Sequence, residues 1–184
     1  MPSSAIKGGL ITKYGLTCIG IVFKAEKGTG DDVNDYDGKL TAIHGYAVAL
    51  KDAHTSPGAW GIRLVDENKA GRNSQSITDY DGYSNTTYIR NIGNAYTNTD
   101  VSAPLKNSQY WAFKVASVYQ PVSSVTPAAP VNSSGWYLPS YKQFDDLRTI
   151  ENIGDSRLNA VSYIKMTSHN TDNENHYWTS TEAS

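Results

Sequence analysis

The segment around Ser140 constrains the fold more than any other part of this chain. Ser140 stands three residues before Gln143, and this Ser-x-x-Gln spacing is typical of a capping box, in which each side chain bonds the other residue's backbone N–H at the start of a helix. Pro139 precedes the cap, and Gly154 follows as a stop signal. The apolar residues between them recur at helical spacing: Phe144, Leu147 and Ile150. We therefore expect an amphipathic helix that begins after Ser140 and packs this face against a core.

Strand signals dominate the first third of the chain. Residues 17–23 are β-branched and apolar enough for a strand covered on both faces, and residues 45–50 form a second candidate. Residues 60–65 have an alternating pattern of side chains that indicates a short third strand, and a polar loop is expected over residues 66–83. The connection 26–39 is rich in Gly and Asp and too poor in apolar residues to be core. We expect it to be a hairpin-like link.

Further helices are expected on both sides of the capping box. Residues 87–96 have apolar residues at helical spacing, with Asn85 and Thr86 as N-cap candidates ahead of them. Residues 108–119 fit a helix, although a strand is the alternative there. A short helix over 155–164 is expected after the capping-box helix.

Length and composition favour one compact domain over residues 1–184, with 1–16 as a leading segment and 122–134 as a Pro- and Ser-rich loop. Thirteen tyrosines and four tryptophans against three phenylalanines favour rings that pack by one edge and hydrogen-bond by the other.

The formal charge of −2 gives no basic field, which excludes nucleic acid as a partner. Asp-Tyr-Asp-Gly occurs at 35–38 and at 79–82, which we interpret as two similar turns.

The single cysteine, Cys18, excludes an intrachain disulfide and a cysteine-built zinc site. It lies in an apolar run, so we expect it to be buried. No apolar stretch is long enough to cross a bilayer, and the first residues lack the pattern of an export signal. If the protein works outside the cell, we expect its export signal on sequence beyond this chain.

Several motifs occur in the order found in one group of bacterial domains. They are Ile-Gly-Ile-Val-Phe at 19–23, His-Gly-Tyr-Ala-Val-Ala-Leu at 44–50 with Ala-Trp-Gly at 59–61, Asp-Gly-Tyr-Ser-Asn-Thr at 81–86, Trp-Tyr-Leu-Pro-Ser at 136–140 and Tyr-Trp-Thr-Ser-Thr-Glu at 177–182. Over residues 17–182 the chain thus resembles the C-type-lectin-like domains of secreted and fimbria-associated surface proteins of Bacteroidetes. That group is distantly similar to the formylglycine-generating-enzyme fold and to the variable proteins of diversity-generating retroelements.

The resemblance implies an α+β, C-type-lectin-like fold, with two main helices packed on twisted antiparallel strands and long loops that present a ligand surface. We expect Trp136, Tyr137, Leu138 and Trp178 to be core. We expect Ser180, Thr181 and Glu182 to satisfy buried turns. In the family, closing strands follow this segment, whereas the sequence given stops two residues later. A trimmed chain, a short protein or a partner that supplies strands to an open sheet edge would each explain this departure.

The acidic residues of the 26–39 connection are the metal candidates. Carboxylate and amide oxygens are the hard ligands that calcium prefers, although their order does not match an EF-hand loop. We weigh calcium, the one candidate cofactor, against a solvated acidic turn. The candidate ligands are Asp31, Asp32, Asn34, Asp35 and Asp37.

Residues 169–178 carry the candidate binding site. They are crowded with side chains that both donate and accept hydrogen bonds, next to two flat rings. Polar side chains next to aromatic rings are suited to binding a glycan or a protein surface. An ordinary solvated loop is the alternative. The candidate ligand-binding residues are Asp172, Asn173, Asn175, His176 and Tyr177.

Catalytic signatures do not occur in the chain. It has no nucleophile elbow, glycine-rich phosphate loop or triad spacing, and one cysteine cannot replace the paired cysteines of formylglycine-generating enzymes. The sequence therefore predicts a non-enzymatic, extracellular, adhesin-like module of a bacterial surface or fimbrial protein, with a glycan or a surface protein as partner. Two alternatives stay open: an assembly subunit that self-associates or accepts a partner strand, and a hydrolase that uses Asp145 or Asp146 with Glu182.

Overall fold

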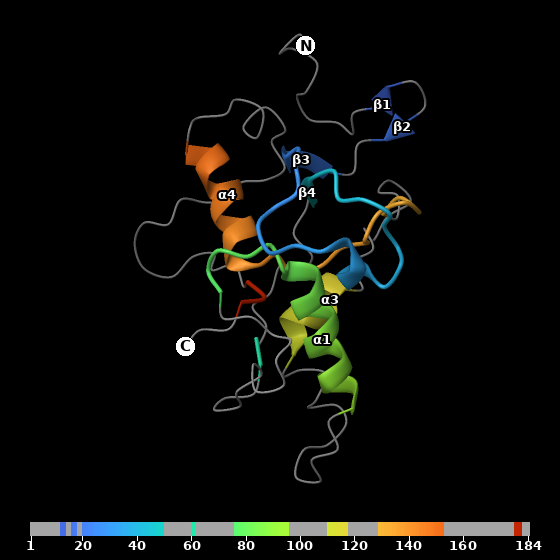
Figure 1. Ribbon diagram of the computed structural model, residues 1–184, viewed down its shortest axis with the longest axis vertical. Coiled ribbons are helices and arrows are strands. Elements are labelled where there is room, and N and C mark those ends of the chain that lie inside the picture. The colour runs from blue at the N-terminus through green and yellow to red at the C-terminus, as the bar shows by residue number, and fades with distance from the viewer. Residues whose placement is uncertain are drawn as a thin grey trace.

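The computed structural model combines helices with antiparallel strand pairs, so the described part of the chain is α+β (Figure 1). It describes residues 12–13, 16–17, 20–49, 60–61, 76–95, 110–117, 129–152 and 179–181. The elements in chain order are β1 (Thr12–Lys13), β2 (Leu16–Thr17), β3 (Gly20–Lys24), the 3₁₀ helix η2 (Val33–Tyr36), β4 (Tyr46–Ala49), α1 (Gly82–Ala95), α3 (Trp111–Ser117) and α4 (Tyr141–Asn152).

Strands β3 and β4 form an antiparallel pair, as the two predicted strands and the hairpin-like link suggested. Ile21 lies opposite Val48 and Val22 opposite Ala47, and the register shifts between Val22 and Lys24. The expectation that β3 is covered on both faces is wrong, because the side chain of Val22 is 65% exposed. One face of the pair is therefore buried, and the other is open at Val22 and Ala47.

Helix α4 covers the buried face of this strand pair, and Figure 1 shows the helix beside β3 and β4. Leu147 is the centre of the contact. Its apolar neighbours come from the helix and from both strands: Phe144, Ile21, Phe23 and Val48. As predicted, the helical spacing of Phe144 and Leu147 places both side chains on the face of α4 that packs against the core. These two side chains join the helix to the strands through one small apolar cluster.

The predicted capping box starts α4. The backbone N–H of Ser140 donates to Gln143 Oε1 over 2.9 Å, and the N–H of Gln143 donates to Ser140 Oγ over 3.3 Å. Gln143 Nε2 also donates to the hydroxyl of Tyr137 over 3.1 Å. Ser140 and Gln143 are both fully buried, so this cap is part of the interior rather than of the surface.

Helices α1 and α3 pack together around a second apolar cluster (Figure 1). Its buried members are Ile89, Tyr110 and Phe113, with Trp60, Tyr88 and Leu138 packed against them. Residues 111–117 form a helix, so the strand alternative for 108–119 is wrong.

Helix α1 begins earlier than predicted, and this corrects the role of its two cap candidates. Asn85 and Thr86 lie inside the helix and are fully buried. Thr86 Oγ1 lies 2.7 Å from the Gly82 carbonyl oxygen of its own helix and accepts the backbone N–H of Leu138 over 3.0 Å. The polar side chain that looked like a cap therefore docks α1 onto the segment before α4.

The connection 26–39 contributes to the interior, contrary to the sequence-based expectation. It contains η2, whose N-cap Asp32 accepts the backbone N–H of Asn34 over 2.9 Å. Tyr36 at the end of η2 is 2% exposed. An apolar count misses such a residue, since a tyrosine can be buried when its hydroxyl finds a partner.

Some predicted features lie outside the described residues. They are Cys18, most of the 60–65 strand and the 155–164 helix.

Candidate functional site

Residues 179–181, here called the clamp, are fixed by hydrogen bonds to distant parts of the chain. Trp60 Nε1 donates to the carbonyl oxygen of Thr179 over 2.6 Å. Asn85 Nδ2 lies 3.5 Å from Ser180 Oγ, and both side chains are fully buried. These contacts tie the clamp to the apolar cluster of α1 and α3.

The clamp also meets the first turn of α4. The backbone N–H of Ser180 donates to the carbonyl oxygen of Pro139 over 2.7 Å. The N–H of Tyr141 donates to Thr181 Oγ1 over 2.9 Å. The first N–H groups of a helix have no partner within the helix, so Thr181 satisfies one of them. This is the turn-satisfying role that the sequence predicted for the Thr181 hydroxyl, whereas the Ser180 hydroxyl lies near Asn85 of α1 instead.

A buried carboxylate, Asp31, lies at the junction of η2 and β4. Its side chain is 5% exposed, and its Oδ2 accepts the hydroxyls of Tyr36 over 2.8 Å and Tyr46 over 2.5 Å. The backbone N–H of Gly28 donates to the Tyr46 hydroxyl over 2.9 Å. Burial raises the pKa of the Asp31 carboxyl, against the hydrogen bonds from Tyr46 and Tyr36, which lower it.

The tyrosines around Asp31 are neutral donors. Burial raises the pKa of Tyr36, of Tyr46 and of Tyr137 well above the usual range of a phenol. The nearby Asp31 carboxyl raises all three further, because a second negative charge beside it is unfavourable. These hydroxyls therefore keep their protons across the physiological range, and those of Tyr36 and Tyr46 hold Asp31 by hydrogen bonds.

The two Asp-Tyr-Asp-Gly tetrapeptides lie against each other, but the prediction that they are two similar turns is wrong. Residues 35–38 span the end of η2 and the turn after it, whereas residues 79–81 lead into α1, which begins at Gly82. Tyr36 of the first copy stacks on Tyr83, which directly follows the second copy and donates its hydroxyl to Asp37 Oδ2 over 3.0 Å. Tyr80 of the second copy donates its backbone N–H to the Thr29 carbonyl oxygen over 2.9 Å. The repeated tetrapeptide thus marks the surfaces by which the 26–39 connection packs against the start of α1.

The predicted metal ligands are used in other ways. Asp31 accepts two phenol hydroxyls, Asp32 caps η2 together with Asn34, and Asp37 accepts a third phenol hydroxyl. Asp35 is exposed on η2. Within the ranges that the structure describes, no three His, Cys, Asp or Glu side chains are grouped so that they could hold an ion.

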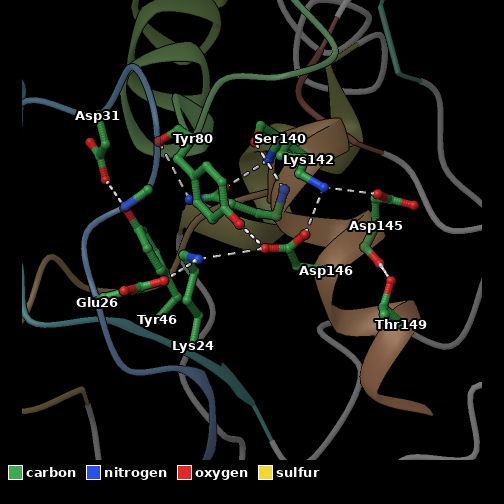
Figure 2. Close-up of polar contacts among 12 residues, drawn as sticks. Lys24, Glu26, Asp31, Tyr46, Tyr80, Ser140, Lys142, Asp145, Asp146 and Thr149 are labelled. Atoms are coloured by element: carbon green, nitrogen blue, oxygen red, sulfur yellow. Dashed lines mark hydrogen bonds and ion pairs between the residues drawn. The ribbon is translucent and has the colours of Figure 1, made fainter. Parts of the chain in front are cut away.

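Asp145 and Asp146 belong to an ion-pair network between α4 and β3 (Figure 2). Lys142 Nζ lies 3.1 Å from Asp145 Oδ2 and 2.8 Å from Asp146 Oδ1. Lys24 Nζ lies 3.9 Å from Asp146 Oδ2, and the Tyr80 hydroxyl donates to that same oxygen. Both carboxylates are thus engaged with cations in a partly exposed surface network.

The predicted ligand-binding residues lie outside the described residues, as do Glu182 and three of the four histidines. His44 is exposed just before β4. The clamp follows the predicted binding segment directly in the chain.

The sequence did not predict that Asp31 is buried and accepts the hydroxyls of Tyr36 and Tyr46. The surplus of tyrosine over phenylalanine pointed to buried rings with hydrogen-bonding tips. It did not show that Tyr36 and Tyr46 share one acceptor. The acidic residues around Asp31 left a calcium ligand and a solvated acidic turn as the two alternatives, whereas Asp31 is buried by contacts with Tyr36 and Tyr46, which lie 5 and 15 residues away in sequence.

In the portion of the chain with described coordinates, no helix is long and apolar enough to cross a membrane.

Comparisons with protein-family models, with curated proteins and with solved structures found no match for this chain.

Proposed function

We propose that this chain is a non-enzymatic, extracellular ligand-binding module of a bacterial surface or fimbrial protein, with a glycan or a protein as its ligand. The observation that carries the proposal is the clamp. It fixes residues 179–181 to Trp60, Asn85 and the start of α4, directly after the segment 169–178 with its polar side chains and rings.

The rings of Trp60 and Tyr137 are occupied by structural contacts. Trp60 packs edge-on against Phe113 with ring centroids 5.2 Å apart, and Tyr137 packs edge-on against Tyr83 at 5.9 Å. Because these rings are engaged in packing within the described residues, the proposed site is placed in the neighbouring segment 169–178, which the sequence predicts to be a polar loop. Polar loops held by a rigid scaffold are a common place for binding residues.

The described elements are compatible with the C-type-lectin-like fold that the sequence motifs imply. The Trp-Tyr-Leu-Pro-Ser segment and the Thr-Ser-Thr segment, 40 residues apart at Tyr141 and Thr181, meet at one helix start. A helix covers one face of an antiparallel pair. Both features support the fold proposal, and the binding role rests on it by analogy.

The ion pairs of Asp145 and Asp146 favour the binding role over the hydrolase alternative. Lys142 contacts both of these side chains, and the Tyr80 hydroxyl donates to Asp146, so both carboxylates are engaged by neighbouring residues of the chain. The network has the geometry of a surface contact between α4 and β3.

The proposal is tested by a binding screen of the full chain against a glycan array and a panel of host surface proteins, with and without calcium. Each reproducible hit is then measured with Asn173, Asn175 and Tyr177 changed to Ala. We expect a loss of at least about tenfold in affinity, since polar and aromatic anchors contribute most of the free energy at such sites.

A matched control shows whether a loss of binding is specific to the predicted site or would follow from any change of exposed asparagines. Asn91 and Asn132 are exposed asparagines far from the segment in sequence, and changing both to Ala is expected to leave the hit unchanged. Equal binding by the Asn173, Asn175 and Tyr177 variant would place the site elsewhere, and the absence of any hit in either screen would contradict the binding role.

A further inference from the structure

Each copy of the repeated tetrapeptide ends in an Asp-Gly peptide bond, at Asp37–Gly38 and at Asp81–Gly82. Such a bond is chemically distinctive, because glycine has no side chain to keep its backbone nitrogen away from the side-chain carboxyl carbon of the preceding aspartate. The nitrogen can attack that carbon and close a succinimide ring. The reaction requires the peptide unit to turn, and the fold treats the two bonds differently in this respect.

The first bond lies in an exposed turn that follows η2. Asp37 and Gly38 are both exposed, with φ angles of 53° and 73°. Beyond the chain neighbours of Gly38, no heavy atom lies within 4 Å of the position that a Cβ on this residue would take. The turn is spanned by a hydrogen bond from the backbone N–H of Lys39 to the carbonyl oxygen of Tyr36 over 2.9 Å. Once this turn opens, the Gly38 nitrogen has room to swing towards the Asp37 carboxyl group.

The second bond lies at the enclosed start of α1. A Cβ on Gly82 would lie 2.7 Å from the Ser140 backbone nitrogen and 2.9 Å from the Leu138 carbonyl oxygen. The Asp81 carbonyl oxygen accepts the backbone N–H of Asn85 over 3.0 Å. A rotation that carries the Gly82 nitrogen towards the Asp81 carboxyl group would break this first helical turn and press the peptide against the start of α4.

We propose that Asp37 is a site of spontaneous isoaspartate formation in the folded protein, whereas Asp81 is protected by its place at the start of α1. The Gly38 nitrogen attacks Cγ of Asp37, and a carboxyl oxygen leaves as water together with the amide proton and a proton from solvent. Water then opens the succinimide. Opening at the original backbone carbonyl leaves the peptide bond on Cγ, which is isoaspartate, and opening at Cγ restores aspartate. The modification does not rest on the binding role.

Isoaspartate at this position changes the contact between the 26–39 connection and α1. The main chain gains a carbon before Gly38, and the free carboxylate moves from Cβ to Cα. The Tyr83 hydroxyl, which donates to Asp37 Oδ2 over 3.0 Å, then loses its acceptor at that place. Because the turn that Tyr36 and Lys39 close becomes longer, we expect the stack of Tyr36 on Tyr83 to loosen.

The test is incubation of the full chain at neutral pH, followed over time by peptide mass spectrometry with fragmentation that distinguishes isoaspartate from aspartate. We expect isoaspartate to accumulate at Asp37 at least about tenfold faster than at Asp81, which corresponds to a barrier lower by about 1.4 kcal/mol. Equal rates at the two sites, or a faster rate at Asp81, would overturn the proposal.

The same chain unfolded in urea is the control for sequence effects. Both bonds then lie in the same tetrapeptide without the surrounding structure, so their rates should converge. A difference that persists in urea would show that local sequence, and not the fold, selects Asp37.

Asp37→Asn and Asp81→Asn are a matched pair of variants. Asparagine closes the same ring with loss of ammonia, and the hydrolysed product is heavier, so the mass of the intact protein reports the conversion. Asparagine also tolerates the left-handed backbone of residue 37. We expect Asp37→Asn to convert at least about tenfold faster than Asp81→Asn. Equal conversion of two folded variants would contradict the protection, and the wild-type comparison decides the matter if Asp81→Asn does not fold.

The structural consequence has its own measurement. Protein that carries isoaspartate at position 37, separated from unmodified protein by chromatography, should show faster amide hydrogen exchange over residues 33–39 and unchanged exchange at Leu147. Unchanged exchange over 33–39 would contradict the loosening of the contact with α1.

Discussion

The rings of Tyr36 and Tyr83 stack with their centroids 4.6 Å apart and an interplanar angle of 23°. Each ring belongs to, or directly follows, one copy of the same tetrapeptide. The contact joins η2 to α1, and Lys39 Nζ lies 5.1 Å from the Tyr83 ring centroid on the surface side. A connection that is polar in sequence is thereby packed by aromatic rings.

Gly82→Ala is expected to destabilise the protein, although the same change in an exposed helix interior stabilises by about 1 kcal/mol. A Cβ at Gly82 would lie 2.3 Å from Gln143 Oε1 and 2.7 Å from the Ser140 backbone nitrogen. Overpacking of this kind costs about 1–3 kcal/mol in the free energy of unfolding, measured in urea. Asn91→Ala, at an exposed site on α1, is the control and should be neutral or stabilising. Wild-type stability in Gly82→Ala would contradict the close approach of the α1 and α4 starts.

Trp60→Phe tests the clamp. The variant keeps a ring against Phe113 but removes the N–H that bonds the Thr179 carbonyl oxygen, so we expect a loss of about 1–2 kcal/mol. Amide exchange of Ser180 should accelerate more than that of Leu147. Phe113→Leu is the comparison, since it weakens the core without touching the clamp. Uniform acceleration in Trp60→Phe would count against a specific role for the indole N–H.

The two apolar clusters are expected to contribute independently. Phe113→Ala should cost about 3–5 kcal/mol and Leu147→Ala about 2–5 kcal/mol, because each leaves a cavity in a different cluster. Val131→Ala, at a side chain that is 97% exposed, should change stability by less than about 0.5 kcal/mol. In urea denaturation, the double variant should equal the sum of the single variants within about 0.5 kcal/mol. A larger coupling would show that the clusters are one core.

Alkaline unfolding is expected to begin near about pH 10. Burial raises the pKa of Tyr46 in the folded state, so the unfolded chain loses this proton first, and stability falls as the pH rises above the unfolded value. Exposed tyrosines such as Tyr141 ionise in the folded protein, so the readout is the free energy of unfolding in urea at several pH values above about 10. Tyr46→Phe removes one buried group and should give a shallower fall in stability. An equally steep fall in Tyr46→Phe would contradict burial of this hydroxyl.

Local signals predicted the secondary structure well where they were strong. The capping box at Ser140 and Gln143 gave the start of α4 and its apolar face, because both depend on residues within one or two turns. The β3 and β4 hairpin was also visible as two apolar runs around a polar link. The start of α1 was misplaced, because Thr86 has the side chain of a cap and is instead used for docking to Leu138.

Non-local features were not accessible from sequence. The burial of Asp31 depends on Tyr46, which is 15 residues away, and on rings brought in by α1 and by the segment before α4. The charge pattern of the 26–39 connection instead suggested either a calcium site or a solvated acidic turn. The same limit applies to the clamp, whose composition indicated turn-satisfying hydroxyls but not Trp60 as a partner.

The clamp also imposes an order on folding. The bond between Trp60 and Thr179 spans 119 residues, and that between Asn85 and Ser180 spans 95. A chain made from its N-terminus onward can complete its local hairpin and helices early, whereas these bonds must wait until residue 180 has emerged. Closing such long loops is slow relative to local pairing, so the apolar cluster around Phe113 must persist for a time without its last hydrogen-bonded neighbours.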